Sequence, residues 1–212
     1  MIYVFDLDGT LIDSTFRHGY LMGRLLREEG IEVEESFWDR YLNLKREGLN
    51  SKAVLRDVYG FEEGLVDRVV KKWVEQIESD EMLAYDKLYD DSIETLERIK
   101  VRGNKIYYLS LRQREDAAID ELKRLGIYDY AEEVFIGKPS EGVQYKVGKL
   151  RLLKSIDKIK MVGDTEVDYE AAKNVSSSFV GLYRGFRSKS FWDGMSIHSI
   201  KDLKEIKKEK QV

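Results

Sequence analysis

Two aspartates separated by one residue, Asp6 and Asp8, follow the apolar run Ile2–Phe5 and precede Gly9. A short apolar run that ends at a turn residue predicts a strand buried on both faces. Two carboxylates at the end of such a strand repel each other and lose hydration, unless a cation, a phosphate or a proton-transfer reaction accounts for them. The alternative is an ordinary turn at Asp8-Gly9-Thr10 with Asp6 capping the strand, and the pair alone favours neither interpretation.

Three further apolar runs are predicted strands, and a polar residue follows or ends each of them. The runs lie at residues 105–110, 134–136 and 159–162. The polar residues at their ends are Ser110, Lys138, Asp164 and Asp168. Because ligands of open parallel sheets bind outside the carboxyl ends of the strands, we expect these side chains to converge with Asp6 and Asp8. This convergence favours a reaction centre over a simple turn.

The rest of the pattern predicts the elements that carry these residues. Four helices are expected between the first two strands, at residues 14–29, 34–46, 50–59 and 62–78, which is typical of a small helical bundle. After residue 86, strands alternate with helices, which predicts a three-layer α/β/α, Rossmann-like parallel sheet. The expected domains are an α/β catalytic core at 1–13 and 86–212 and an inserted four-helix cap at 14–85. A Lys/Glu-rich helix with a thin apolar edge is expected after Ile200.

Composition limits the classes of protein to which the chain can belong. Its 212 residues include 36 basic and 40 acidic side chains, and the net charge of −4 argues against nucleic-acid binding. No apolar run approaches membrane-spanning length, and Asp6 and Asp8 interrupt the N-terminal apolar stretch, so neither a membrane segment nor a signal peptide is expected. A cytoplasmic location is therefore predicted, and the balanced charge leaves both a monomer and a homodimer open.

The available ligands limit the kind of metal site. The chain has no cysteine and only two histidines, His18 and His198, so thiolate chemistry and a histidine-rich metal site are excluded. A bound metal would be held by carboxylate and carbonyl oxygens, which suits magnesium or calcium. His18 is expected to be a half-buried structural residue rather than a ligand.

Taken together, the motifs resemble those of the haloacid dehalogenase superfamily. The resemblance rests on D-x-D-G-T at Asp6–Thr10, a strand ending in Ser110, a lysine, and a loose match to G-D-T-x-x-x-D at 163–168, where the last aspartate lies four positions after Asp164. The resemblance covers the whole chain. The members that the chain resembles are phosphatase-type proteins with a helical cap after the first core strand, the group of phosphoglycolate phosphatases and β-phosphoglucomutases. In that family the cap is mobile and covers the site.

This resemblance implies a role for each motif residue. Asp6 is expected to be the nucleophile that forms an aspartyl-phosphate, and Asp8 the acid/base that protonates the leaving oxygen and then activates water. Ser110 is expected to bind a phosphoryl oxygen. Magnesium is expected to be held by Asp6, the main-chain carbonyl of Asp8 and Asp164, with Asp168 helping directly or through a water.

Positive charge near the phosphate is harder to assign. Lys138, which precedes the only proline of the chain, resembles the Lys-Pro form of the third family motif and is favoured. Lys146 and Lys149 remain alternatives, because some members carry this lysine on the following helix. Arg112, close after Ser110, is a further candidate to reach the phosphate. The cap segment 44–52 occupies the position that selects substrate in the family, but it is equally compatible with an ordinary charged loop.

The predicted function is a magnesium-dependent phosphatase that hydrolyses a small phosphorylated metabolite. A phosphomutase acting on a sugar phosphate would use the same residues and is the main alternative. A true dehalogenase is disfavoured, because that chemistry needs neither the second carboxylate at Asp8 nor a metal pair at Asp164 and Asp168. A non-enzymatic, receiver-like phospho-acceptor is also disfavoured, because such modules lack a helical insertion of this length.

Overall fold

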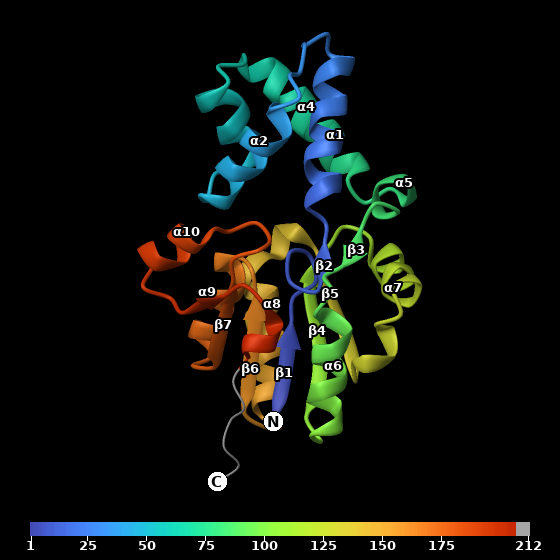
Figure 1. Ribbon diagram of the computed structural model, residues 1–212, viewed down its shortest axis with the longest axis vertical. Helices are drawn as coiled ribbons and strands as arrows, with labels where there is room; N and C mark the ends of the chain where they lie inside the picture. The colour runs from blue at the N-terminus through green and yellow to red at the C-terminus, as the bar shows by residue number, and fades with distance from the viewer. Residues whose placement is uncertain (207–212) are drawn as a thin grey trace.

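The computed structural model describes residues 1–206 and contains a six-stranded parallel sheet in the order β5-β4-β1-β6-β7-β8. The strands are β1 Ile2–Phe5, β4 Lys105–Leu111, β5 Glu133–Gly137, β6 Ile159–Gly163, β7 Ser178–Leu182 and β8 Ser199–Ile200. The carboxyl ends of the central strands face the helical cap (Figure 1). The edge of the sheet at which the sequence predicts the site is therefore the edge that the cap covers.

Helices cover both faces of this sheet, because the side chains of its strands are apolar in both directions. In β1, Tyr3 and Phe5 pack in a core cluster with α6 (Ser92–Val101) and α7 (Glu115–Arg124). The alternate residues Ile2 and Val4 pack in a second cluster with α8 (Gly142–Lys154) and α9 (Glu166–Asn174). The expected three-layer α/β/α arrangement is confirmed.

The inserted segment forms a helical cap with its own core. Its elements are α1 Thr15–Glu28, α2 Phe37–Arg46, α3 Ser51–Ala53, the π-helix η1 Val54–Val58, α4 Glu63–Gln76 and α5 Asp80–Leu83. Leu21 and Leu25 of α1 pack against Tyr41 of α2 and Val69 of α4. The third expected helix is thus an α-turn that continues as a π-helix, and α5 is an additional short helix.

A small antiparallel ribbon connects the cap to the sheet, and its two strands come from the two linkers. β2 (Ile12–Asp13) pairs with β3 (Lys87–Leu88), so the chain enters and leaves the cap side by side (Figure 1). Ser92 strengthens this junction by donating a hydrogen bond of 2.8 Å to the carbonyl of Leu11. The ribbon fixes where α1 begins relative to the end of β1.

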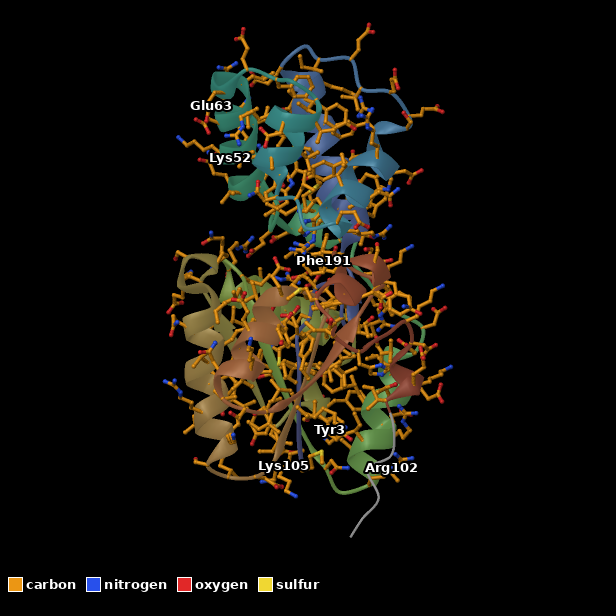
Figure 2. All side chains as sticks on the ribbon, turned by 90° about the vertical axis from the view of Figure 1, so that its left-hand side faces the viewer. Tyr3, Lys52, Glu63, Arg102, Lys105 and Phe191 are labelled. Carbon is orange, nitrogen blue, oxygen red and sulfur yellow. The ribbon has the colours of Figure 1, made fainter. Side chains whose placement is uncertain are left out.

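The cap also touches the core through the segment after β7. The amide of Ser188 donates to the carbonyl of Arg46 at the end of α2, at 2.9 Å. Phe191, on α10 (Lys189–Gly194), lies at the junction of cap and core (Figure 2). A Cβ on Gly48 would come within 2.8 Å of its ring, so the two segments are in close contact.

The C-terminal segment differs from the expected helix. Within the described residues it forms β8 and the short 3-10 helix η4 (Leu203–Glu205). Ile200, Leu203 and Ile206 are buried in the sheet's core instead of forming a thin edge, because β8 adds a strand to the sheet and turns them inward. The rest of the expected helix, at 207–212, lies outside the described residues. Across residues 1–206, every helix is too short or too polar to span a bilayer.

Candidate active site

Strand register brings the predicted residues to one edge of the sheet. Phe5 pairs with Tyr108 on one side and with Val162 on the other. Asp6 directly follows Phe5, and Ser110 and Asp164 each lie two positions beyond these partners. The three residues therefore emerge side by side at the carboxyl ends of β1, β4 and β6, as the sequence predicts.

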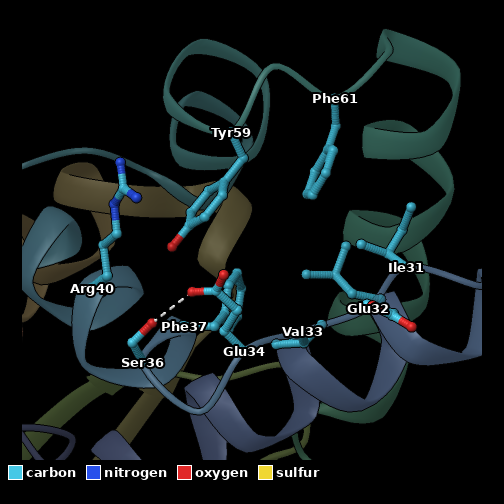
Figure 3. Close-up of a pocket in the computed structure, with 10 residues that line it drawn as sticks. Ile31, Glu32, Val33, Glu34, Ser36, Phe37, Arg40, Tyr59 and Phe61 are labelled. Atoms are coloured by element: carbon cyan, nitrogen blue, oxygen red, sulfur yellow. Dashed lines mark hydrogen bonds between the residues drawn. The ribbon is translucent and has the colours of Figure 1, made fainter.

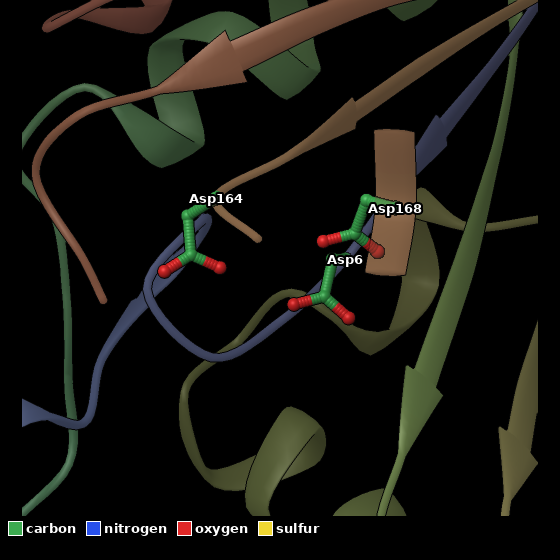
Figure 4. Close-up of side chains that lie close together, drawn as sticks. All are labelled: Asp6, Asp164 and Asp168. Carbon is green, nitrogen blue, oxygen red and sulfur yellow. The ribbon is translucent and has the colours of Figure 1, made fainter. Parts of the chain in front are cut away.

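Three buried carboxylates converge at this edge: Asp6, Asp164 and Asp168 each place an oxygen within 4.8 Å of the others (Figure 4). Asp164 Oδ2 accepts a hydrogen bond from the amide of Phe186 at 2.6 Å. Its Oδ1 is buried and has no hydrogen-bond partner among residues 1–206. An orphaned carboxylate oxygen facing other carboxylates fits a hard divalent cation, for which oxygen donors are the preferred ligands.

The backbone around Asp164 leaves no room for side chains. Gly9 has φ +74°, and a Cβ built on it would lie 2.1 Å from Asp164 Oδ2. A Cβ on Gly185 would meet the same oxygen, also at 2.1 Å. Gly9 thus serves both the turn after Asp8 and the close approach of the β1 loop to this carboxylate.

Lys146, on α8, is the lysine that reaches the carboxylates. Its Nζ donates to Asp6 Oδ1 at 2.7 Å and to Asp168 Oδ1 at 2.6 Å, and its side chain is only 3% exposed. Burial alone would lower the pKa of Lys146, but Asp168 and Asp6 outweigh it and hold that pKa above its usual range. The lysine is therefore charged beside the expected nucleophile.

The structure corrects the preference for Lys138. Its side chain is exposed, and its Nζ donates to the carbonyl of Gln113 at 2.5 Å. The residue lies just beyond β5, the edge strand next to β4, whereas α8 carries Lys146 across to β1. Lys149, the other alternative, points to the rings of Phe135 and Tyr145, with its Nζ 4.6 Å and 5.5 Å from their centroids.

Without a cation, the buried carboxylates are hard to ionise. Burial raises the pKa of Asp6 to about 7, with Lys146 opposing the shift and Asp168 adding to it. Burial also holds the pKa of Asp164 well above its usual range, and Asp6 adds to this effect. A bound cation would favour the ionised form of each group, which is what metal ligation and nucleophilic attack both require.

Asp8 is held by two arginines. Arg17 Nη2 donates to its Oδ1 at 2.5 Å, and Arg112 Nε donates to its Oδ2 at 2.6 Å. Burial opposes ionisation of Asp8, but Arg112 and then Arg17 outweigh it and hold the pKa of this carboxyl far below its usual range. Asp8 is therefore an ionised carboxylate in this arrangement.

Arg112 lies at the site but is itself anchored. Besides Asp8, it donates from Nη2 to Glu121 at 2.9 Å, and it is 2% exposed. Its Nη1 is buried and lacks a hydrogen-bond partner within residues 1–206. Arg112 thus keeps one guanidinium nitrogen whose hydrogen-bond donors are unused within these residues. Ser110 is also 2% exposed, at the end of β4 beside this group.

Asp168 has a supporting position. Its Oδ1 accepts from Lys146, and its Oδ2 accepts from the Thr165 hydroxyl at 2.9 Å and the Thr165 amide at 3.3 Å. This is the capping box of α9, which fixes the carboxylate at the helix start. Both carboxylate oxygens of Asp168 therefore already accept hydrogen bonds, one from Lys146 and the other from Thr165.

Sequence reasoning did not single out Arg17, although a signal was present. Arg17, Leu21 and Leu25 share one face of α1 at four-residue spacing, and all three are buried. A charge on a buried helix face needs a partner, and here the partners are Asp8 and Asp86. The same signal applies to Lys146, which shares the buried face of α8 with Leu150 and Leu153.

A separate pocket of about 320 Å³ lies within the cap and is lined by cap residues only (Figure 3). Phe37, Tyr59 and Phe61 form apolar walls, and Arg40 lies over the Tyr59 ring at 5.2 Å. Its lining contains none of the strand-end carboxylates.

Comparisons with known proteins agree with this geometry. A phosphoglycolate phosphatase from Aquifex aeolicus is 29% identical over 187 residues, which cover 83% of this chain and 81% of that protein. An inferred phosphatase from Clostridium difficile superposes with a TM-score of 0.78 at 22% identity, covering 97% of this chain and 95% of that one. A haloacid dehalogenase-like hydrolase from Streptococcus pneumoniae superposes with a TM-score of 0.76 at 16% identity, with the same coverage. These two structures have the same fold.

The family assignment rests on the sequence itself. Residues 1–176 match the family described as haloacid dehalogenase-like hydrolases. The match includes the cap and all the strand-end residues discussed above, from Asp6 to Asp168. The expected enzyme class is therefore confirmed, and the chain belongs to the haloacid dehalogenase-like hydrolase family.

Proposed function

We propose that this hydrolase is a divalent-metal-dependent phosphatase, with Asp6 as the nucleophile that attacks phosphorus in a small phosphomonoester. The observation that carries the proposal is the position of Asp6, between the ammonium of Lys146 and the carboxylates of Asp164 and Asp168. A carboxylate approaches a phosphate dianion only where nearby positive charge offsets the repulsion. The similarity to a phosphoglycolate phosphatase supports the same chemistry.

Different residues would hold the metal ion and bind the phosphoryl group. Asp6, Asp164 and the main-chain carbonyl of Asp8 would hold magnesium, with Asp168 supporting them through Lys146. When bound, the cation neutralises charge on the carboxylates and on the phosphoryl oxygens. Lys146, the free Nη1 of Arg112 and the Ser110 hydroxyl are the donors available to the phosphoryl group.

Two steps complete the proposed reaction. Asp6 attacks phosphorus, the ester oxygen leaves, and the enzyme carries an aspartyl-phosphate. Asp8 gives a proton to the leaving oxygen, then takes one from the water that attacks the same phosphorus, which frees Asp6. Because Asp8 is ionised while Arg17 and Arg112 hold it, it must separate from them and take up a proton from solvent before it can act as the proton donor.

The test is hydrolysis of a generic aryl phosphate by the purified full-length chain. We expect turnover with magnesium, loss of turnover with EDTA and recovery when magnesium is returned. Asp6→Asn should abolish activity and also the acid-stable, hydroxylamine-sensitive phosphoenzyme that a labelled substrate leaves on the wild-type protein. Asp120→Asn, at an exposed position on α7, is the matched control and should retain both. Turnover that persists in the Asp6→Asn variant would refute the assignment of Asp6 as the nucleophile.

A further inference from the structure

A chain of buried charged groups leads from the core helix α7 to Asp8. Glu121, on α7, accepts a hydrogen bond of 2.9 Å from Nη2 of Arg112. The same Nη2 donates to Asp8 Oδ1 at 3.0 Å, while Nε of Arg112 donates to Asp8 Oδ2 at 2.6 Å. The side chains of Arg112 and Glu121 are 2% and 1% exposed. One buried guanidinium is therefore shared by two carboxylates, of which only Asp8 takes part in the proposed reaction.

Glu121 occupies a position where the pattern of α7 is apolar. Ala117, Ala118 and Leu122 lie on the same buried face of the helix as Glu121. A buried carboxylate costs desolvation energy, and well-packed apolar side chains in place of a buried ion pair often leave stability unchanged or raise it. The packing of α7 thus does not require a glutamate at this position, and its interaction with Arg112 is the feature that needs an explanation.

The proposed reaction explains why Arg112 needs a second anion. To give a proton to the leaving oxygen, the Asp8 carboxyl has to move away from the arginines that hold it. A guanidinium that is 2% exposed would then be a buried cation without an anion, which is strongly unfavourable. With Glu121 in place, Arg112 keeps an ion pair at 2.9 Å after Asp8 has left. The free energy needed to release Asp8 is therefore lower.

Arg17, the second arginine on Asp8, is arranged in a similar way. Its Nη1 donates to the carbonyl of Ile77 at 3.0 Å, and its Nε lies 3.0 Å from Asp86 Oδ1. Each arginine thus has a second partner that takes no part in the proposed reaction. Because one arginine lies on the cap helix α1 and the other follows the core strand β4, this shared arrangement is better explained by Asp8 than by the packing of either element.

We infer that Glu121 is a positioning residue that acts through Arg112: it keeps the guanidinium paired and in place while the Asp8 carboxyl leaves, and so makes Asp8 available for proton transfer. This inference rests on the proposed phosphatase function. It adds to that reaction a residue outside the group of strand-end side chains. Without Glu121, Arg112 depends on Asp8 for its ion pair, and Asp8 leaves it less readily.

Substituted phenyl phosphates test this role, because they differ mainly in how much the leaving oxygen needs a proton. From 4-nitrophenyl phosphate to phenyl phosphate the leaving oxygen becomes more basic, so its departure depends more on a general acid such as Asp8. The value of kcat/KM reports the steps up to formation of the phosphoenzyme. With magnesium present, we expect Glu121→Met to lower kcat/KM by about 10-fold or more for phenyl phosphate, but by less than about 3-fold for 4-nitrophenyl phosphate.

Two further variants complete the series. Glu121→Gln keeps the size of the side chain and one acceptor for Arg112, so its kcat/KM for phenyl phosphate should lie between those of the wild type and Glu121→Met. Glu115→Met, at an exposed position in the first turn of α7, is the matched control and should keep the wild-type values throughout. Circular dichroism and thermal unfolding establish that each variant is folded.

The dependence on the leaving group separates this role from a merely structural one. A loss of equal size across the whole series, or no loss, in folded Glu121→Met protein would overturn the inference, because a general disturbance of the site does not depend on the leaving oxygen. If Glu121→Met does not fold, Glu121→Gln decides by the same criterion. Absence of turnover by the wild type on every member of the series would instead refute the phosphatase function, so the two failures are distinguishable.

Discussion

Lys146 and Asp6 lie 140 positions apart in the chain, yet the lysine ammonium contacts the carboxylate at 2.7 Å in the interior of the protein. The contact exists because α8 crosses one face of the sheet and directs Lys146 toward the end of β1. It places a fixed positive charge on the residue that we propose as nucleophile. The same ammonium also binds Asp168 and so couples the nucleophile to the start of α9.

Removing this ammonium should nearly abolish activity. Lys146→Met is expected to lower kcat/KM for an aryl phosphate by about 10²-fold to 10³-fold, because one preorganised donor to the reacting charge is lost. Lys138→Met is the matched control and should stay within about 2-fold, because its ammonium binds only a surface carbonyl. Steady-state kinetics and circular dichroism on both variants check this. The reverse pattern would restore Lys138 as the functional lysine.

Two glycines with almost the same backbone geometry should respond differently to alanine. Gly9 and Gly103 have φ values of +74° and +72°, but only Gly9 has a neighbour, Asp164, within 4 Å of an added Cβ. Gly103→Ala should cost about 1–2 kcal/mol of unfolding free energy, from backbone strain alone. Gly9→Ala should cost more and lose activity, because its Cβ displaces the Asp164 carboxylate. Urea denaturation and assays compare them, and equal costs with full activity would contradict the prediction.

The buried pair of Arg17 and Asp86 should be strongly coupled. Arg17 is 1% exposed, and its Nε lies 3.0 Å from Asp86 Oδ1 at the second linker of the cap. Arg17→Met should destabilise the protein by about 3–5 kcal/mol, because it leaves the buried Asp86 carboxyl without its ion-pair partner. Adding Asp86→Asn should recover about 1–3 kcal/mol of that loss in a double-mutant cycle.

The exposed pair of Lys52 and Asp67, on the cap surface, provides the control for this cycle. Its side chains are 53% and 54% exposed, so water screens the interaction although the atoms are 2.5 Å apart. Its coupling free energy should be below about 1 kcal/mol. Equal coupling in the two cycles would show that burial of Arg17 contributes nothing.

Stability should depend on pH through Lys45. Its pKa is about 8 in the folded protein, against 10.5 in an exposed chain, so the unfolded state binds more protons between these values. The stability of the wild type therefore gains from rising pH in this interval, as the half-buried ammonium loses its charge. Lys45→Met should be about 1–3 kcal/mol more stable at pH 7, and the difference should vanish by pH 10.5. Urea denaturation across this range checks it, and a constant difference would contradict it.

Much of the fold and part of the site follow from local sequence patterns. Apolar runs and helical periodicity gave the order of strands and helices, because burial on one or two faces selects those periods directly. Asp6, Ser110 and Asp164 were predicted from their position after a strand, since parallel strands deliver their carboxyl ends to one edge. The ribbon of β2 and β3 and the short β8 were missed, because two-residue strands carry too little pattern.

The choice among the lysines and the partners of Asp8 depended on tertiary structure. Lys138 lies in a familiar local motif, but the path of α8 over the sheet decides that Lys146 reaches Asp6. Arg17 reaches Asp8 because the linker ribbon fixes the start of α1 beside the end of β1. Local sequence determines which residues lie at strand ends and on helix faces. The packing of elements far apart in the chain determines which charged side chains form ion pairs. A buried ion pair forms only where this packing brings the two charged groups into contact away from water.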